Sequence, residues 1–287
     1  MYRYLLFQIG HFLVNSLPLS VSYFLARTLC NCHYVLSVAD RKYVTKNLKI
    51  ICGEGADIPK LTREVFHNFG IYLVEFFRLK KMVADKFIEE NVTFENVEVL
   101  KRVRDSGKGM IILTAHIGNW EYGGILLGKL GYPLTIIALA HQQHSVNTYF
   151  NQQRMMTGNR IVKINIAIRA CTEVLKDRGQ VAIAADRDFT NTGDVVEFLG
   201  RQSRLPKGAA LFSLRLDVPI VASFLTREGN GKYRLSFEEP IYPTEAKKLT
   251  NKEDQVHFLM RTYLKRIEAK IRQYPSQWLM FREFALE

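Results

Sequence analysis

The chain has 287 residues, enough for one large domain or for one domain with an appendage. Its composition, 47% hydrophobic and 24% charged, is that of a globular protein and excludes a disordered chain, a collagen and a coiled coil. Forty Lys and Arg against 28 Asp and Glu give a net charge of +12, which predicts an acidic partner: nucleic acid, an anionic membrane surface or an acidic protein. The four Cys form no C-x-x-C pair, and we expect free thiols in a reducing compartment.

The N-terminal segment is apolar and uncharged from Tyr4 to Ala26. Pro18 would break a membrane-spanning helix near its middle, so two shorter helices are predicted, at Tyr4–Val14 and Leu19–Leu36. The cations that follow are Arg41, Lys42, Lys46 and Lys49. Apolar helices followed by cations are typical of a monotopic anchor on an anionic membrane surface, and a pair of buried core helices is the alternative. We therefore expect a membrane-associating helical segment at 1–38 and an α/β domain at 39–287.

The remaining elements alternate between helices and apolar strands. Residues 40–100 are expected to be helical, with a 3.6-residue apolar period over Leu61–Lys80. The expected strands are Met110–Ala115, Leu134–Ala140, Val181–Ala185, Pro219–Leu225 and, after a hairpin turn at 228–231, Tyr233–Phe237. The expected helices are Asn96–Ser106, Trp120–Leu130, Tyr149–Thr157, Ile166–Asp177, Lys207–Leu216 and Lys252–Arg272. This alternation predicts an α/β fold with a mostly parallel central sheet flanked by helices and a late antiparallel hairpin.

Ionisable side chains follow the first predicted strand, where parallel sheets bind ligands. His116 comes just after this strand, and Glu121 falls in the first turn of the next helix, with Asn119 as its expected N-cap. The loop between them would let the carboxylate fold back onto the imidazole. Such a pair can take a proton from a hydroxyl as a general base. The alternative is a surface histidine beside a capping glutamate.

A second polar feature is the basic segment 200–208, which we expect to be a loop that opens a helix. Its glycines and cations are Gly200, Arg201, Arg204, Lys207 and Gly208. Free backbone N–H groups at a helix start, together with these cations, could hold a phosphate; the alternative is a solvated basic loop. Arg154 and Arg187 are each either salt-bridge partners or ligand contacts, depending on whether they face the His116 cleft.

Other chemical motifs are absent from the sequence. It holds no G-x-S-x-G nucleophile elbow, no Walker A loop and no G-x-G-x-x-G. The segment 141–144 offers His141 and His144 as metal ligands without a third, so it is expected to be a polar loop. We expect neither a metal nor a cofactor.

The segment Thr114–Glu121, TAHIGNWE, resembles the first motif of the bacterial lipid A biosynthesis acyltransferases, which belong to the wider lysophospholipid and glycerophosphate acyltransferase superfamily. Further segments resemble the motifs of that family in the same order: Arg154 with Gly158, Ala185-Asp186, 196–200, 206–209 and 275–278. Arg187 stands where the family usually has Gln, Leu199 replaces the second Phe of its F-F-G motif, and the usual Trp and His after Trp278 are missing. These departures concern the identity of the acceptor more than the chemistry.

The resemblance implies that His116 and Glu121 form a catalytic dyad, in which Glu121 orients His116 and His116 deprotonates an acceptor hydroxyl that attacks an acyl thioester. It implies a donor, acyl carrier protein or acyl-CoA, that is acidic, in agreement with the charge of +12. The acceptor would be a lipid A precursor, a lysophospholipid or another glycolipid or aminolipid, at the cytoplasmic face of the bacterial inner membrane. We expect substrate contacts from Asn119, Arg154, Asp186, Arg187, Gly200, Arg204, Lys207 and Gly208.

Two other functions are considered. The same dyad could activate water, giving a thioesterase or lipase that releases free fatty acid. The positive charge alone could indicate nucleic-acid binding, which needs cations clustered on one face with aromatic stacking positions. Here the cations are spread along the chain and no nucleic-acid-binding motif is found, so no nucleic-acid partner is expected.

Overall fold

The structure, a computed structural model, describes residues 2–139, 143–229 and 231–286. Its central sheet has seven strands in the order β1-β9-β8-β2-β5-β3-β4. The strands are β1 (Val92–Glu95), β2 (Met110–Thr114), β3 (Leu134–Ala138), β4 (Arg160–Lys163), β5 (Gln180–Ala184), β8 (Ile220–Gly229) and β9 (Lys232–Phe237). All neighbours pair in parallel except β8 and β9. The predicted α/β fold, with a mostly parallel sheet and a late antiparallel hairpin, is confirmed.

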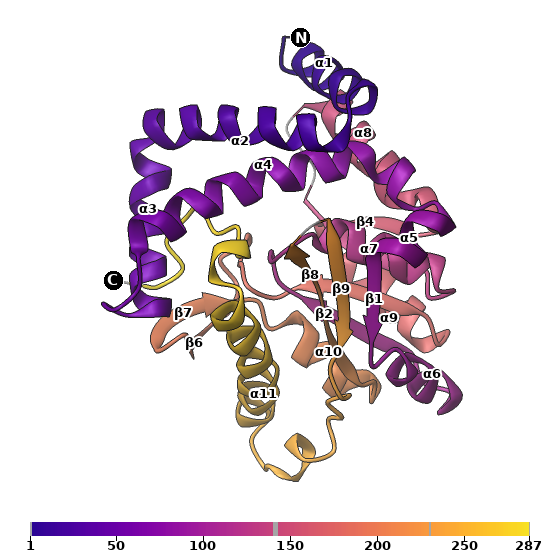
Figure 1. The fold of residues 1–287 in the computed structure, drawn as a ribbon. Coiled ribbons are helices and arrows are strands. Elements are labelled where there is room, and N and C mark those ends of the chain that lie inside the picture. Colours follow the sequence, from indigo (N-terminus) through magenta and orange to yellow (C-terminus); the bar gives the residue numbers. More distant parts are fainter. Residues whose placement is uncertain (1, 140–142, 230, 287) are drawn as a thin grey trace.

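Helices cover both faces of this sheet (Figure 1). They are α1 (Tyr2–Ser16), α2 (Leu19–Leu36), α3 (Val38–Cys52), α4 (Ile58–Met82), α5 (Asp85–Asn91), α6 (Glu98–Asp105), α7 (Trp120–Lys129), α8 (His144–Arg154), α9 (Ala167–Lys176), α10 (Gly208–Leu216) and α11 (Lys252–Gln273). Successive side chains of a strand point to opposite faces, so Ile111 packs with α9, α10 and α11 while Ile112 packs with α4, α6 and α7. Both are buried, which is why the strand is a continuous apolar run.

The N-terminal helices lie over α4, the long helix that separates them from the sheet (Figure 1). Helix α2 runs alongside α4, and Gly70 permits the close approach, because a Cβ at that position would lie 2.6 Å from the Sγ of Cys30. The outer sides of α1 and α2 carry exposed apolar residues, among them Phe12, Phe24 and Leu29. Of the helices in the described part of the chain, none is long and apolar enough to cross a bilayer. The division of the chain at residue 38 stays a prediction.

Three segments differ from the sequence expectation. Residues 92–95, expected to be helical, form strand β1, where VTFE alternates between partly buried and exposed positions. The short strand β4 at the sheet edge was not expected, because RIVK is too short to show a pattern. The basic segment after Gly200 is not a loop: Arg201–Leu205 form β7, which pairs antiparallel with β6 (Asp194–Phe198) outside the main sheet.

We predict that Phe76→Ala destabilises the protein by about 3–5 kcal/mol, because Phe76 is fully buried between α4 and α8, where its ring stacks on Phe150 with centroids 4.3 Å apart. Urea unfolding measures the loss. Phe12→Ala, at a position that is 68% exposed, is the matched control and should change stability by less than about 0.5 kcal/mol. Equal losses in the two variants would contradict this packing.

Candidate active site

The register of the sheet brings two distant residues together at the carboxyl ends of neighbouring strands. In β2 and β5, Thr114 lies opposite Ala184. His116 and Asp186 each come two residues after these partners, so the parallel pairing places them side by side although 70 residues separate them in the chain. Ligands of parallel α/β sheets bind at this edge.

Asp186 is the centre of a hydrogen-bond cluster. Its Oδ1 is 2.8 Å from the Nδ1 of His116, and its Oδ2 accepts the backbone N–H of the same histidine at 3.0 Å. The Nε1–H of Trp278 also donates to Oδ2, at 2.8 Å. The carboxylate is 1% exposed, so these donors take the place of water around its charge.

The protonation of this pair follows from its surroundings. Burial by itself would raise the pKa of the Asp186 carboxyl, but the charge and hydrogen bond of His116, with Arg187 and Trp278, outweigh burial and hold that pKa well below its ordinary range. An ionised carboxylate only accepts hydrogen bonds, so Nδ1 of His116 must carry a proton. In the neutral ring Nε2 is then unprotonated and can act as a base.

The loop after His116 is held against the C-terminal segment. Leu279 N–H donates to the carbonyl of His116 at 2.9 Å, and Gly118 N–H donates to the carbonyl of Gln277 at 3.0 Å. Gly118 has φ +61°, and a Cβ there would lie 1.9 Å from the carbonyl oxygen of Leu225, so only glycine fits. The terminal P-S-Q-W segment therefore has a structural explanation: its backbone supports the loop and its tryptophan binds Asp186.

The expected contact between Glu121 and the imidazole is wrong. Glu121 does lie in the first turn of α7, and Asn119 does cap that helix, with Oδ1 accepting the N–H of Tyr122 at 3.0 Å. Its carboxylate, however, turns to Arg154, whose Nε and Nη2 donate to its two oxygens at 2.9 and 2.5 Å. Burial lowers the pKa of Arg154, but the charge and hydrogen bonds of Glu121 outweigh it and raise that pKa. A bidentate pair of this kind gives both carboxylate oxygens of Glu121 a charged donor, which a contact with one imidazole nitrogen would not.

A pocket of about 1090 Å³ opens at this edge of the sheet, and His116, Glu121, Arg154 and Arg187 are among its polar lining residues. The rest is mostly apolar. On the α7 face of the sheet its lining residues are Ile112, Gly123, Gly124, Leu127, Leu134, Ile136 and Leu235, and on the other face Ile137, Ala167, Ile168, Ile183, Leu211 and Phe212. Because this pocket borders both faces, the last residues of β3 and β5 are only partly buried although these strands lie inside the sheet.

The other expected contacts divide between the pocket and the β6–β7 hairpin. Arg187, Lys207 and Gly208 line the pocket; Arg187 Nη2 also donates to the carbonyl of Leu279, and Lys207 pairs with Asp194 at 2.6 Å. Gly200 lies in the hairpin turn with φ +78°, and Arg204 donates to the carbonyl of Gly193 at 3.0 Å. Neither is among the described residues that line the pocket. The His141 position lies outside the described residues.

Sequence reasoning missed two parts of this site. The first is the pairing of His116 with Asp186, although a signal was present: each residue follows its strand at a matching distance. The second is the contribution of aromatic rings, since Trp120 packs edge-on against His116 with centroids 4.8 Å apart and Phe189 lies 6.3 Å away. No spacing rule would have indicated these contacts.

A histidine–carboxylate pair beside a large, mostly apolar pocket fits an enzyme that acts on hydrocarbon chains. The chain belongs to the bacterial lipid A biosynthesis acyltransferase family, whose sequence model matches residues 1–284. It is similar to the phosphatidylinositol mannoside acyltransferase of Mycolicibacterium smegmatis, with 26% identity over 243 residues, 83% of this chain and 77% of that protein. It is also similar to the phosphatidylinositol mannoside acyltransferase of Mycobacterium tuberculosis H37Rv, with 25% identity over 244 residues, 83% of this chain and 74% of that protein. The protein is thus an acyltransferase of lipid biosynthesis.

We predict a pH-dependent loss of stability in Asp186→Asn. The lowered pKa of Asp186 means that its ionised form stabilises the folded protein above the pKa of the unfolded state, and that this contribution is lost as the pH falls through the folded-state pKa. The deficit of the variant in unfolding free energy should be full at about pH 7 and shrink below about pH 4. Urea unfolding at both pH values measures it, with the exposed Asp105→Asn as control. A deficit independent of pH would contradict the assignment.

Proposed function

We propose that this acyltransferase moves a fatty acyl chain from a thioester donor, acyl carrier protein or acyl-CoA, to a hydroxyl of a lipid acceptor. The observation that carries the proposal is the position of His116. Its Nδ1 is fixed on an ionised carboxylate, its ring lines the pocket, and the apolar lining of the pocket suits a hydrocarbon chain.

In the proposed mechanism, Nε2 of His116 takes the proton of the acceptor hydroxyl as the oxygen attacks the thioester carbonyl carbon. The new C–O bond forms, the C–S bond breaks, and the imidazolium returns its proton to the departing sulfur. Asp186 holds the ring and stabilises its positive charge. Arg187 lines the same pocket, so its cation favours the negative charge that develops on the carbonyl oxygen.

The acyl chain is assigned to the lobe of the pocket beneath α7. Gly123 and Gly124 face the sheet there, and a Cβ on Gly124 would meet Leu134 and Ile136 at 3.7 and 3.9 Å. The absence of both side chains thus leaves room between helix and sheet. The lining residues on the α7 face of the sheet are mostly aliphatic, which favours a hydrocarbon chain by desolvation.

The acidic donor and the lipid acceptor are proposed to meet at the basic side of the pocket. Lys207, Arg215 and Lys252 line it, with Gly208 at the start of α10. Cations and helix N–H groups bind phosphate, which acyl carrier protein, CoA and many lipid headgroups carry. The names of the mycobacterial relatives favour a glycolipid hydroxyl as the acceptor.

We propose that the enzyme acts at the cytoplasmic face of the inner membrane. Both N-terminal helices carry large exposed apolar residues: Leu5, Ile9, Phe12, Leu13, Val21, Phe24, Leu25, Leu29, Val35 and Leu36. Scattered apolar residues are normal on a surface, but this density on two adjacent helices is typical of a membrane or protein contact. An amphipathic surface of this kind supports peripheral or monotopic association.

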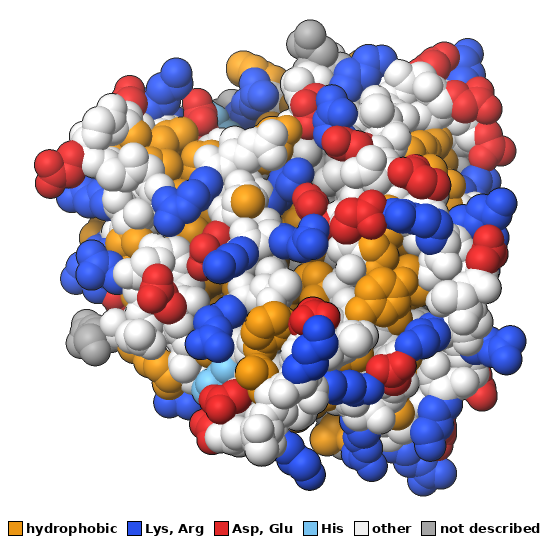
Figure 2. Space-filling view, turned by 90° about the horizontal axis from the view of Figure 1, so that it is seen from below, with side chains coloured by type: hydrophobic (Ala, Val, Ile, Leu, Met, Phe, Trp, Pro, Cys, Tyr) orange, Lys and Arg blue, Asp and Glu red, His pale blue; other side chains and the backbone are white. Residues whose placement is uncertain are grey.

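The net charge of +12 is better explained by these partners than by nucleic acid. On the face shown in Figure 2, Lys and Arg are intermingled with Asp and Glu instead of forming one basic stripe. Nucleic-acid grooves gather cations along a track with aromatic rings between them.

We predict that His116→Ala lowers kcat for acyl transfer by at least about 10²-fold, since the general base is lost. The assay follows a long-chain acyl thioester with and without a glycolipid acceptor. His257→Ala is the matched control, because it removes the imidazole of another histidine–aspartate pair, with Asp194 at 3.1 Å, and should keep its turnover. Turnover retained by folded His116→Ala would refute the mechanism, and free fatty acid formed at equal rates without acceptor would identify a thioesterase.

We predict that the protein sediments with anionic vesicles and that the double variant Phe24→Glu, Leu29→Glu sediments several-fold less. Both positions are about 70% exposed, so the charges should leave the fold intact while preventing burial in the membrane. Val195→Glu, at an exposed apolar position of β6, is the control. If all three proteins sediment equally, the N-terminal helices are not the contact surface.

A further inference from the structure

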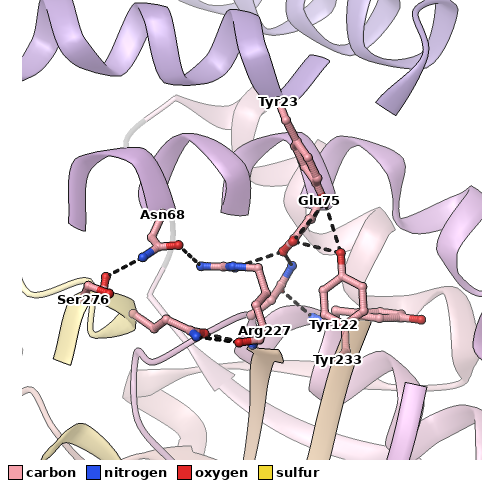
Figure 3. A network of polar contacts seen from close by, with 9 residues as sticks. Tyr23, Asn68, Glu75, Tyr122, Arg227, Tyr233 and Ser276 are labelled. Atoms are coloured by element: carbon pink, nitrogen blue, oxygen red, sulfur yellow. Dashed lines mark hydrogen bonds and ion pairs between the residues drawn. The ribbon is translucent and has the colours of Figure 1, made fainter. Parts of the chain in front are cut away.

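A third buried carboxylate lies beside the catalytic loop, the segment from His116 to the start of α7, and the proposed mechanism does not use it. Glu75 is in the middle of α4 and has no exposed surface. Its Oε2 accepts from Asn119 Nδ2 at 2.7 Å and from Arg227 Nη1 at 3.2 Å, and its Oε1 accepts from the hydroxyls of Tyr233 and Tyr23 at 2.9 and 3.3 Å (Figure 3). Side chains from four other elements thus converge on one carboxylate.

The two tyrosines of this cluster act as donors throughout the ordinary pH range. Burial, and then the charge of Glu75, raises the pKa of Tyr233 and of Tyr23 above its usual value. Arg227 supplies the positive charge that a buried carboxylate needs. Asn119, Arg227 and the two tyrosines all donate to the Glu75 carboxylate, so the geometry of the cluster depends on Glu75.

The hydrogen bond between Asn119 and Glu75 connects the cluster directly to the catalytic loop. Because its Nδ2 is held by Glu75, the amide oxygen of Asn119 must face the N–H of Tyr122, where it caps α7. The backbone N–H of Asn119 is bonded to the carbonyl of Leu225 at 3.0 Å. The loop from His116 to the start of α7 is thereby fixed at its far end by the orientation of one amide.

The ion pair between Arg227 and Glu75 connects the cluster to the C-terminal segment that holds Asp186. The side chain of Gln277 bonds both backbone groups of Arg227, accepting from N–H at 2.9 Å and donating to the carbonyl at 2.8 Å. The next residue, Trp278, donates to Asp186. Arg227 Nη2 also bonds Asn68, which holds the carbonyl of Ser276 (Figure 3). Glu75 thus supports both the loop that carries His116 and the segment that holds its carboxylate.

The hydrogen bond from Tyr23 to Glu75 connects the cluster to α2. The outer side of this helix carries the exposed apolar residues Phe24 and Leu29. We propose that Glu75 is a positioning residue of the acyltransferase reaction: through Asn119 and Arg227 it fixes the catalytic loop, and through Tyr23 it ties that loop to the N-terminal helices. The role in catalysis rests on the proposed function of His116.

The experiment separates the bond to Asn119 from general stability. Asn119→Ser keeps an N-cap of equal quality but is too short to reach Glu75. Tyr233→Phe, the control, removes another buried donor from the same carboxylate without touching the loop. We expect Asn119→Ser to lower kcat about 10- to 100-fold with the donor KM unchanged, and Tyr233→Phe to lower the melting temperature while kcat stays within about twofold.

Two changes at Glu75 itself complete the test. Glu75→Gln retains one oxygen that can face Asn119 and should keep more of kcat than Glu75→Leu, which retains none. Where Glu75→Leu fails to fold, the comparison of Asn119→Ser with Tyr233→Phe decides. A wild-type kcat in Asn119→Ser, or an equal loss in Tyr233→Phe at equal folded fraction, would overturn the proposal.

A readout independent of the reaction keeps this proposal distinct from the proposed function. Amide hydrogen exchange over residues 116–122 should be faster in Asn119→Ser than in the wild type and unchanged in Tyr233→Phe. Exchange that is unaltered in Asn119→Ser would refute the positioning role even if acyl transfer is observed. Altered exchange in a protein that transfers no acyl group would refute the function of His116 but leave Glu75 as the residue that fixes the loop.

Discussion

The bonding of one buried carboxylate, Asp186, is the constraint on which the site depends. A carboxylate that is 1% exposed is tolerated only when its oxygens are fully hydrogen-bonded and its charge is compensated. Its donors come from His116 and Trp278, which are 162 positions apart in the chain. The carboxyl end of β5, the loop after β2 and the C-terminal segment must all be in place before this charge can be buried. The pairing of His116 with Asp186 therefore requires the complete tertiary fold.

Three buried acid–base pairs surround the loop that begins at His116. Asp186 holds the imidazole, Glu121 holds Arg154, and Glu75 holds Arg227 and the helix cap Asn119. Charges in a water-excluded environment interact strongly and tolerate little displacement, so each pair has one favoured geometry. Together they give a rigid polar region beside a mostly apolar pocket.

The fold class and the edge of the sheet that holds the site could be predicted from the sequence, because both depend on local patterns. Continuous apolar runs marked the buried strands β2, β5 and β8, and polar residues directly after them marked their carboxyl ends. Strands β1 and β4 were missed, since they are four residues long and lie at the two edges of the sheet, where one side needs no pairing and the pattern is weak. The hairpin 194–205 was missed because its charged residues face solvent.

The sequence by itself determined the chemistry available: an imidazole after one strand, carboxylates after two, and a motif order that resembles an acyltransferase family. Only the tertiary structure decided which carboxylate serves the imidazole. Glu121 is near His116 in the chain, yet it binds Arg154, because two charge-assisted bonds to a guanidinium outweigh one to a ring nitrogen. Asp186 is far away in the chain but adjacent in the sheet, since parallel pairing fixes residues across strands at a constant offset. Sequence spacing predicts which residues lie close together only within one helix or strand. Which partner a side chain binds depends on all the groups that the fold brings near it.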